Sequence, residues 1–311
     1  MSNRISLLAN PRELGIAIMQ KTASHWSDKT YLRVLHFLNT GRMLRLKNPQ
    51  TYSEKCQWMK LYYQRPEITN MADKYEVKKY VADRIGKEYV VDCYGVWEPF
   101  DEIDFDKLPE QFVLKCTHNS GSFVICTDKK SLDKNAAKEK LEKALNANYY
   151  LNGREWVYKN IQPRIIAEKY MDSLGRPDSI EYKITCMGGA VSFVTICGGI
   201  AHALYEQRSN DHYTKDWQHM PWYARYKPSG KEYVKTPEIE KMIEFSEKLS
   251  QGIPQVRVDW YIHEDQIYFG EFTFYTWNGW PRFTPKEWDK KLGTMFVLPE
   301  EKYIEKDRNN K

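Results

Sequence analysis

Apolar and polar residues alternate along two neighbouring segments between residues 254 and 274, a period of two that predicts a β-hairpin. Arg257 and Asp259 share one face of the first segment, and Glu271 and Thr273 share one face of the second. Charged groups standing on an apolar sheet are costly unless a cation or a phosphate compensates them. The opposite face is expected to be a buried wall, made of Val256, Val258, Trp260, Tyr268, Phe272 and Phe274.

The two carboxylates can share one ligand only if the hairpin places Asp259 opposite Glu271. This requires an odd number of residues in the loop after His263, such as residues 264–266, because an even loop would put the carboxylates on opposite faces. With an odd loop, both could reach a hard cation such as Mg²⁺. The alternative is an ordinary exposed hairpin face, on which Arg257 and Asp259 form a solvated ion pair.

Helical and strand patterns are mixed along the rest of the chain. Apolar periodicity and capping residues predict helices over residues 12–40, 53–65, 73–84, 132–148 and 237–251. Strand patterns cover residues 89–91, 110–117, 123–126, 164–171, 181–187 and 190–197, with Gly188-Gly189 as a hairpin turn. Residues 198–232 are expected to be a long irregular stretch rich in aromatic residues. Antiparallel hairpins mixed with helices predict an α+β fold.

Composition narrows the function classes. The 311 residues include 47 basic and 42 acidic side chains, and this mild excess without a Lys/Arg block gives no indication of nucleic-acid binding. The six cysteines have no Cys-x-x-Cys spacing and lie mostly in apolar runs, so we expect reduced thiols, no zinc site and a cytoplasmic location. No apolar run has the length of a signal peptide core or a transmembrane segment, so any membrane role is expected to be peripheral.

Two lysines are candidates for phosphate binding. Lys115 ends an apolar segment just before the turn at residues 118–122, where backbone N–H groups and an ammonium can converge on an anion. Lys183 lies in the alternating segment that begins at Glu181. Taken singly, each also fits a common surface feature, because Ser-Gly turns are frequent and a lysine in an alternating strand ordinarily faces solvent.

Read in order, these features resemble the ATP-grasp superfamily. The motifs are Ala72-Asp-Lys-Tyr, Lys78, Phe112-Val-Leu-Lys-Cys-Thr-His-Asn-Ser-Gly121, Ile165-Ile-Ala-Glu-Lys-Tyr-Met171, Glu181-Tyr-Lys183, Val256-Arg-Val-Asp-Trp-Tyr261 and Tyr268-Phe-Gly-Glu-Phe-Thr-Phe274. Together with Tyr52-Ser-Glu-Lys55 and Trp58, they are similar to the branch associated with teichuronopeptide and other surface-polysaccharide biosynthesis. The resemblance spans roughly residues 50–295.

The resemblance implies an ATP-grasp fold, in which two α/β lobes with antiparallel sheets clasp a nucleotide. It divides the chain into an N-terminal helical region at residues 1–85 and a small lobe with the phosphate loop and hinge at 86–171. A metal- and acceptor-binding lobe follows at 172–300, and a charged tail at 301–311.

The resemblance also implies roles for individual residues. Lys78 and Lys115 would contact the phosphates of ATP, and the turn at residues 118–122 would close over them. Glu168 would bind the adenine amino group, and Glu181 would bind the ribose. Mg²⁺ would be held by Asp259 and Glu271, with Thr273 as a third candidate, and Arg257 would stabilise the oxyanion. The expected catalytic residues are Arg257, Lys115 and Lys183. The expected nucleotide-binding residues are Lys78, Lys115, His118, Ser120, Gly121, Ser122, Glu168, Lys169, Tyr170, Met171 and Glu181.

Two positions depart from the family pattern. Thr273 stands where many ATP-grasp ligases have asparagine, and a hydroxyl is a poorer Mg²⁺ ligand than a carbonyl oxygen. The phosphate turn contains a single glycine, Gly121.

The function implied is a Mg²⁺/ATP-dependent carboxylate–amine ligase that works through an acyl phosphate. Its expected partners are a uronic-acid carboxylate of a surface glycan and an amine such as an amino acid, with the aromatic residues at 202–226 and 275–280 on the glycan side. Three alternatives stay open. The first is a glycosyltransferase that uses a nucleotide sugar, although no Asp-x-Asp motif follows a parallel strand here. The second is a sugar kinase with Asp211 or His212 as the general base, and the third is a non-catalytic carbohydrate-binding module.

Overall fold

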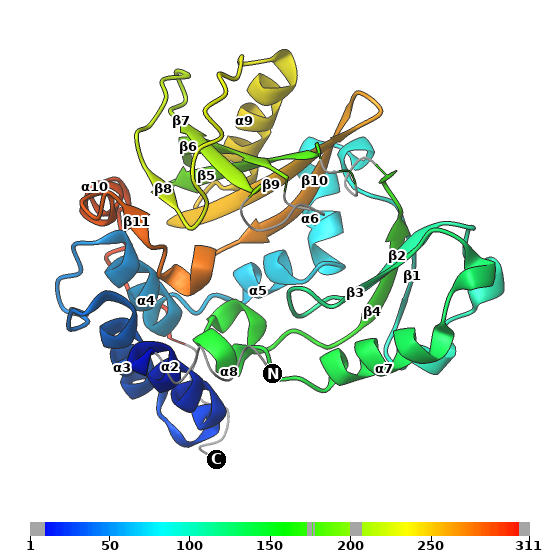
Figure 1. Cartoon of the computed structure of the whole chain (residues 1–311), viewed down its shortest axis with the longest axis horizontal. Helices are drawn as coiled ribbons and strands as arrows, with labels where there is room; N and C mark the ends of the chain where they lie inside the picture. Colours follow the sequence, from blue (N-terminus) through cyan, green and yellow to red (C-terminus); the bar gives the residue numbers. More distant parts are fainter. Residues whose placement is uncertain (1–9, 173–175, 177, 200–206, 305–311) are drawn as a thin grey trace.

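Two separate antiparallel sheets and a group of N-terminal helices make up this computed structural model (Figure 1). The structure describes residues 10–172, 176, 178–199 and 207–304. Of the segments discussed above, residues 1–9, His202, Tyr205 and the tail from 305 onward lie outside the described part.

The described part of the N-terminal region contains five α-helices, and local capping explains where several of them begin. Helix α4 starts with a capping box, in which the Thr51 side chain accepts from the backbone of Glu54 and the Glu54 carboxylate accepts from the backbone of Thr51. Asp73 accepts from two backbone N–H groups at the start of α6, as predicted. The helices are α2 (Pro11–Lys21), α3 (Asp28–Thr40), α4 (Tyr52–Tyr62), α5 (Pro66–Ala72) and α6 (Glu76–Ile85).

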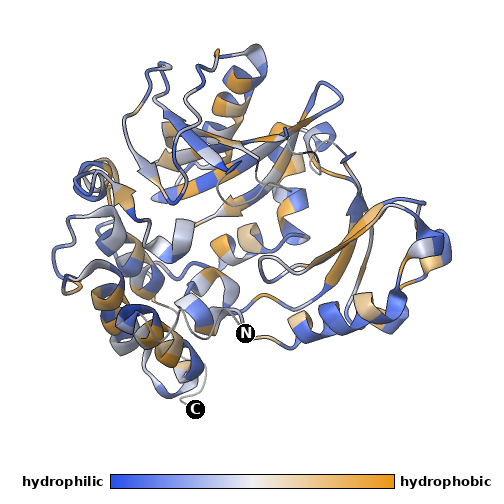
Figure 2. Cartoon of the chain, in the orientation of Figure 1, coloured by the Kyte–Doolittle hydropathy of each residue, from blue (hydrophilic) through white to orange (hydrophobic). Residues whose placement is uncertain are grey.

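The smaller sheet has the order β1-β4-β2-β3 and is antiparallel throughout. Its strands are β1 (Cys93–Trp97), β2 (Phe112–Cys116), β3 (Phe123–Cys126) and β4 (Ile165–Lys169). Helix α7 (Lys134–Leu145) buries Ala137 and Leu141 against Phe112 and Leu114, and most of its other residues are hydrophilic (Figure 2). The strand predicted at residues 89–91 is wrong, because a 3₁₀ turn ends at Tyr89 and β1 begins at Cys93.

The larger sheet has the order β10-β9-β5-β6-β7 and is also antiparallel. Its strands are β5 (Ile180–Met187), β6 (Ala190–Gly198), β7 (Ser209–Tyr213), β9 (Gln255–His263) and β10 (Gln266–Thr273). Helix α9 (Pro237–Leu249) covers one face of this sheet, and the Trp260 indole donates to Ser246 of α9 at 2.9 Å (Figure 1). The opposite face is left for charged and polar side chains.

Two short strands and two short helices complete the strands and α-helices of the described residues. Strands β8 (Tyr223–Ala224) and β11 (Phe283–Thr284) form a two-stranded sheet, and helix α10 (Trp288–Met295) follows. The short helix α8 (Tyr150–Gly153) lies between α7 and β4 in sequence. Strands β7 and β8 lie in the stretch predicted to be irregular, so that prediction is wrong for these residues.

The hairpin of β9 and β10 differs from the prediction in an informative way. Its loop has two residues, Glu264 and Asp265, both with positive φ, so the predicted odd loop is wrong. The pairing register then shifts by one residue between Phe269 and Phe272, which is a β-bulge. Since Thr273 now pairs with Arg257, the bulge restores the common face that an odd loop would have given.

The same bulge decides which residues of β10 are buried. Ile267 and Phe269 are buried before it, and Phe272 and Phe274 are buried after it. Tyr268, which was expected in the buried wall, is therefore only partly buried. Val256, Val258 and Trp260 of β9 are fully buried, as predicted.

Candidate active site

A cluster of buried charges stands on the open face of the larger sheet. The Arg257 guanidinium donates to both oxygens of Asp259, from Nε at 2.6 Å and from Nη2 at 2.7 Å. The Lys183 ammonium donates to the same carboxylate at 3.0 Å and forms an ion pair with Glu181 at 2.7 Å. The sheet register explains this grouping, because Lys183 on β5 lies directly opposite Asp259 on β9.

These charges hold one another in their ionised forms. Burial opposes the charged form of Asp259, but Arg257 and Lys183 outweigh it and lower the pKa of the carboxyl group. Burial likewise opposes the cationic form of Arg257, yet Asp259 raises the pKa of the guanidinium above its usual value. With Asp259 only 1 % exposed, the exposed ion pair considered as the alternative is not what the structure contains.

Arg257 is held in one orientation by three residues. Besides Asp259, it donates from Nη2 to the Thr273 hydroxyl at 2.9 Å and from Nη1 to the Thr276 hydroxyl at 3.3 Å. These contacts use four of the five N–H donors that a guanidinium carries. One N–H of Nη1 thus has no partner among the described residues and is available to a substrate oxygen.

The carboxylates and hydroxyl expected to hold Mg²⁺ form an oxygen-only set, which suits a hard cation. Both Asp259 oxygens accept hydrogen bonds, so a cation would use the remaining lone pair of Oδ1. Glu271 has no such competition, since the Lys74 ammonium, its ion-pair partner among the described residues, lies 4.0 Å away. In the described residues no group of three or more His, Cys, Asp or Glu side chains gathers, so substrate phosphates would complete the coordination.

A second charge cluster lies in the smaller sheet. The Glu168 carboxylate on β4 forms an ion pair with Lys78 of α6 at 2.7 Å and another with Lys115 of β2. Burial raises the pKa of Glu168, but the two ammonium groups more than offset this effect and lower it overall. The structure therefore brings together three of the predicted nucleotide-binding residues, with Glu168 bound to the two lysines.

Lys74 connects the two clusters and was not recognised from the sequence. Its ammonium donates to the backbone carbonyl of Asn119 in the phosphate turn and lies 4.0 Å from Glu271 in the large sheet. Burial lowers the pKa of Lys74, although Glu271 acts in the opposite direction. The motif Ala72-Asp-Lys-Tyr contains this lysine, but nothing in the spacing distinguished it from Lys78.

The residues of the phosphate turn have unequal surroundings. Gly121 adopts a positive φ of 86°, and Ser122 donates to the side chain of Asn119. The His118 ring is buried against α7, where Nε2 lies 3.1 Å from the Ala144 carbonyl, and burial lowers its pKa. Ser120 lines the cavity described next, whereas the contact of His118 with Ala144 is typical of a packed histidine.

The segment proposed as a hinge leaves the small sheet at β4. Lys169 ends β4 and its backbone N–H donates to the Asp92 carbonyl, while Tyr170 is partly buried and Met171 is buried. Glu181, the expected ribose acceptor, begins the large sheet and is bound to Lys183. These residues lie outside the lining of the main cavity.

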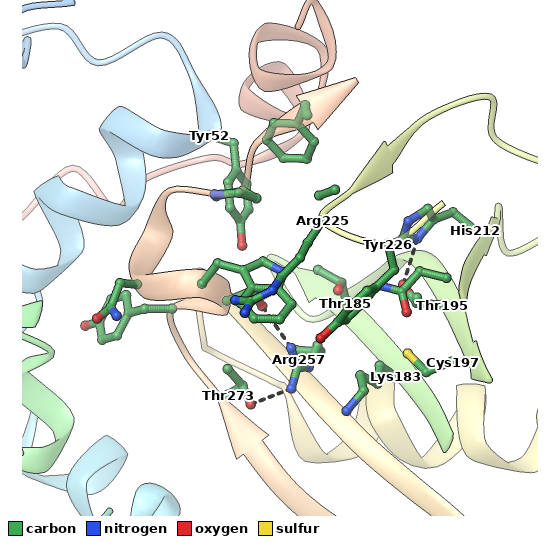
Figure 3. Close-up of a pocket in the computed structure, with 18 of the residues that line it drawn as sticks. Tyr52, Lys183, Thr185, Thr195, Cys197, His212, Arg225, Tyr226, Arg257 and Thr273 are labelled. Carbon is green, nitrogen blue, oxygen red and sulfur yellow. Dashed lines mark hydrogen bonds between the residues drawn. The ribbon is translucent and has the colours of Figure 1, made fainter. Parts of the chain in front are cut away.

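A cavity of about 500 Å³ opens over the charged face of the larger sheet (Figure 3). Arg257, Lys183 and Thr273 form part of its lining, and Arg225, the residue just after β8, projects into it (Figure 3). Its ionisable lining contains four cations, Lys183, Arg208, Arg225 and Arg257, against two carboxylates, Glu155 and Glu271. Such a site favours substrates that carry more negative than positive charge.

Aromatic side chains form much of the remaining wall, and several of them come from residues 212–226 and 275–277. Trp222 stacks on the neutral ring of His212 at a centroid distance of 3.6 Å, and burial lowers the pKa of His212 to about 3. The Arg225 guanidinium lies 4.3 Å from the centre of the Trp277 ring. Tyr226 and Tyr275 also face this cavity.

A family model identifies the protein family to which this site belongs. The TupA-like ATPgrasp family matches residues 54–297. The chain belongs to the TupA-like ATPgrasp family. The two antiparallel sheets are those of the ATP-grasp fold, and ATP-grasp enzymes use ATP and Mg²⁺. No curated protein matches this ATP-grasp chain in sequence.

Several solved structures are similar to this ATP-grasp chain at low identity. D-alanine–D-alanine ligase from Bacillus anthracis is 15 % identical, with a TM-score of 0.39 over 71 % of this chain and 57 % of that one. D-cycloserine synthetase is 13 % identical, with a TM-score of 0.40 over 74 % and 71 %. A RimK domain ATP-grasp protein from Sphaerobacter thermophilus is 10 % identical, with a TM-score of 0.40 over 74 % and 69 %. The chain spans little more than half the length of the D-alanine–D-alanine ligases that it resembles.

No helix among the described residues is both long and apolar enough to cross a membrane.

Proposed function

We propose that this protein is a Mg²⁺/ATP-dependent ligase that joins an amine to the carboxylate of a uronic-acid glycan. The observation that carries the proposal is the cluster of Arg257, Asp259 and Lys183 beside Glu271, at a cavity in a protein of an ATP-grasp family. A carboxylate does not react with an amine directly, because oxide is a poor leaving group. Transfer of the γ-phosphoryl group to the carboxylate gives an acyl phosphate, and attack by the neutral amine then gives an amide and phosphate.

The side chains of this protein would support both steps. Lys78, Lys115 and Lys74 would bind and orient the phosphates as cations. Arg257, already fixed by Asp259 and Thr273, would direct its remaining N–H to the oxyanion that forms when the amine attacks. Mg²⁺ held by Glu271 and Asp259 would offset the phosphate charge during transfer. Closure of the turn at residues 118–122 would exclude water, which otherwise hydrolyses an acyl phosphate.

The surface next to the cavity supports a large anionic acceptor. A second pocket of about 670 Å³ shares Arg225, Trp277 and Asn278 with the first and extends towards the N-terminal helices. Aromatic rings pack well on sugar rings, and arginine binds carboxylates through paired N–H groups. A uronic-acid chain carries both sugar rings and carboxylates, so it is the substrate class that we propose for these two adjoining pockets. This finer assignment agrees with the resemblance of the motifs to the polysaccharide-biosynthesis branch.

The test is release of ADP that depends on both substrates. Purified protein is incubated with Mg²⁺, ATP, D-glucuronate or short uronate oligomers, and a set of amino acids, and ADP is measured. We expect release only when carboxylate and amine are both present, and loss of that release in Glu271→Gln. Asp259→Asn is a poorer choice because it leaves Arg257 and Lys183 buried without their carboxylate, which is expected to cost several kcal/mol of stability.

The matched control is Glu139→Gln, the same chemical change at an exposed position of α7. It should keep wild-type ADP release and the same thermal unfolding temperature. Equal ADP release by wild type and Glu271→Gln would remove Glu271 from the metal site. Transfer of phosphate to a sugar hydroxyl, with no amine requirement, would instead establish the kinase alternative.

A further inference from the structure

Glu155 is a buried carboxylate that none of the assigned roles explains. It precedes the 3₁₀ helix at Trp156–Tyr158, is 8 % exposed and lines the main cavity. It makes no capping hydrogen bond to that helix. Among the described residues, no hydrogen bond or ion pair reaches its side chain. A carboxylate in this position is costly unless something else compensates its charge.

The buried cation that acts on the charge of Glu155 is already committed to other groups. The Lys60 ammonium donates to the carbonyls of Gly153 and Asn278, each at 2.8 Å, and it forms no ion pair with Glu155. It also lies 4.6 Å from the centre of the Trp280 ring. Lys60 therefore lowers the cost of the Glu155 charge from a distance without neutralising it by contact, and burial still raises the pKa of Glu155.

The surroundings of Glu155 suit a positively charged ligand. Tyr149, Tyr158 and Tyr275 line the same cavity, and the faces of aromatic rings attract ammonium groups. Glu271, the second carboxylate of the lining, adds negative potential, and it raises the pKa of Tyr158 together with burial and Glu155. The four cationic residues of the lining come from elsewhere: from β5, from β9, from the residue just after β8 and from the residue just before β7.

We propose that Glu155 binds the ammonium group of the amine substrate. This inference rests on the proposed ligase function and adds the residue that selects and positions the nucleophile. The carboxylate would hold the ammonium by a charge-assisted hydrogen bond, with the tyrosine rings around it. It would then accept the proton that the ammonium loses before the neutral amine attacks. The cationic side of the cavity would take the carboxylate substrate, so the two substrates are separated by the charges that line their sites.

The experiment compares a charged nucleophile with an uncharged one in wild type and Glu155→Gln. ADP release is measured with D-glucuronate and Mg²⁺-ATP, using either amino acids or hydroxylamine, which is largely uncharged near neutral pH. We expect Glu155→Gln to raise the KM for the amino acid at least tenfold, the factor that corresponds to about 1.4 kcal/mol. The reaction with hydroxylamine and the KM for glucuronate should change less than about twofold.

Controls separate this proposal from a structural role and from the ligase proposal itself. Glu155→Asp keeps the charge and should recover part of the amino-acid affinity, and Glu139→Gln should behave as wild type. Each variant is first checked for its thermal unfolding temperature and for its stabilisation by an ATP analogue. Equal losses with both nucleophiles, or a raised KM for glucuronate alone, would overturn the amine site while leaving the ligase proposal intact.

Binding is measured separately, so that the amine site is tested even if no substrate pair gives ADP release. Saturation-transfer NMR with a mixture of amino acids, in the presence of Mg²⁺ and ADP, reports contact with the protein directly. Contact in wild type that is lost in Glu155→Gln supports the proposal. Absence of contact in wild type, or equal contact in both proteins, contradicts it. Failure of ADP release in wild type with amino-acid contact retained would count against the ligase proposal alone.

Discussion

At the scale of single residues, charge pairing decides how the site is held before any substrate binds. Asp259 is bound by two cations, and Glu168 is bound by two others. Each arrangement keeps a carboxylate ionised in a buried position and fixes the long side chains around it. Sequence patterns identified most of these residues, because Arg257, Asp259 and Lys183 occupy regular strand positions. The residue pattern could not show that Asp259 already has two protein partners.

Lys74 provides the first prediction at this scale. Because its ammonium lies between the phosphate turn and Glu271, Lys74→Met should weaken binding of an ATP analogue about 10- to 100-fold, the effect of losing one charge-assisted contact of about 1.5–3 kcal/mol. Isothermal titration calorimetry with Mg²⁺ present measures this. Lys79→Met is the matched control, since that side chain is exposed on α6 and pairs only with Asp83 among the described residues. Equal affinities for wild type and Lys74→Met would exclude Lys74 from phosphate binding.

Lys74 and Glu155 were missed for a physical reason. Each is a single polar residue in a segment with no repeating pattern, and its importance comes from contacts with parts of the chain far away in sequence. Periodicity reports which face of an element is buried, but it does not report which polar groups lack partners. Only the folded structure shows that Lys74 lies between the phosphate turn and Glu271 of the large sheet, and that Glu155 lines the cavity.

At the scale of elements, the bulge in β10 determines whether Glu271 can work with Asp259. The hairpin turn has an even number of residues and would by itself place Gly270 opposite Asp259. The bulge adds one residue, so Glu271 and Thr273 return to the face that carries Arg257. The prediction of a shared face was therefore right for the register after the bulge, although its explanation by an odd loop was wrong.

Gly270 makes this bulge possible, which gives a prediction for the element. A Cβ atom at this position would lie 2.6 Å from the Tyr261 ring and 3.1 Å from the Asp259 carbonyl. Gly270→Ala should therefore destabilise the protein by about 1–3 kcal/mol, the usual cost of overpacking, and reduce ADP release by displacing Glu271. Urea denaturation gives the free energy of unfolding.

A double-mutant cycle identifies which neighbour causes the destabilisation. In a Tyr261→Ala background the ring is absent, so the cost of Gly270→Ala should be smaller than in wild type. An identical cost in both backgrounds would show that the backbone at Asp259, and not the ring, limits the space. A cost near zero in wild type would mean that the bulge does not need glycine.

Strands β7 and β8 show where sequence patterns stop being informative for elements. β7 has the sequence Ser-Asn-Asp-His-Tyr, which has no apolar alternation, and β8 has only two residues. Strand β7 is positioned by pairing with β6, and β8 is positioned by pairing with β11. Tertiary pairing thus overrides a weak local preference. These two strands nevertheless carry His212 and lead to Arg225, so the hydropathy pattern gave no strand signal for this side of the cavity.

At the scale of the whole molecule, the N-terminal helices bind the C-terminal segments to the body of the protein. Asp289 of α10 accepts from the Ser53 backbone at 2.9 Å, and the Lys55 ammonium donates to the carbonyls of Gly293 and Phe296. Trp280 donates to His36 of α3 at 3.2 Å. The helical region is therefore part of the frame that positions the wall at residues 275–280, and it is more than an appendage preceding the two sheets.

The residues proposed to bind the nucleotide and Mg²⁺ are divided between two sheets, which leads to the last prediction. Glu168 and its lysines belong to the small sheet or pack on it, while Asp259 and Glu271 belong to the large sheet. A Mg²⁺-bound ATP analogue should therefore slow hydrogen exchange in both places, at residues 112–126 and at residues 255–273. At 100 times its Kd it should also stabilise the protein by about 2.7 kcal/mol, and thermal unfolding measures this.

Chelation of Mg²⁺ should remove most of the protection in the large sheet, because its carboxylates would then face the phosphates without a cation. Protection by a nucleotide sugar with none by the ATP analogue would contradict the ligase and favour a glycosyltransferase.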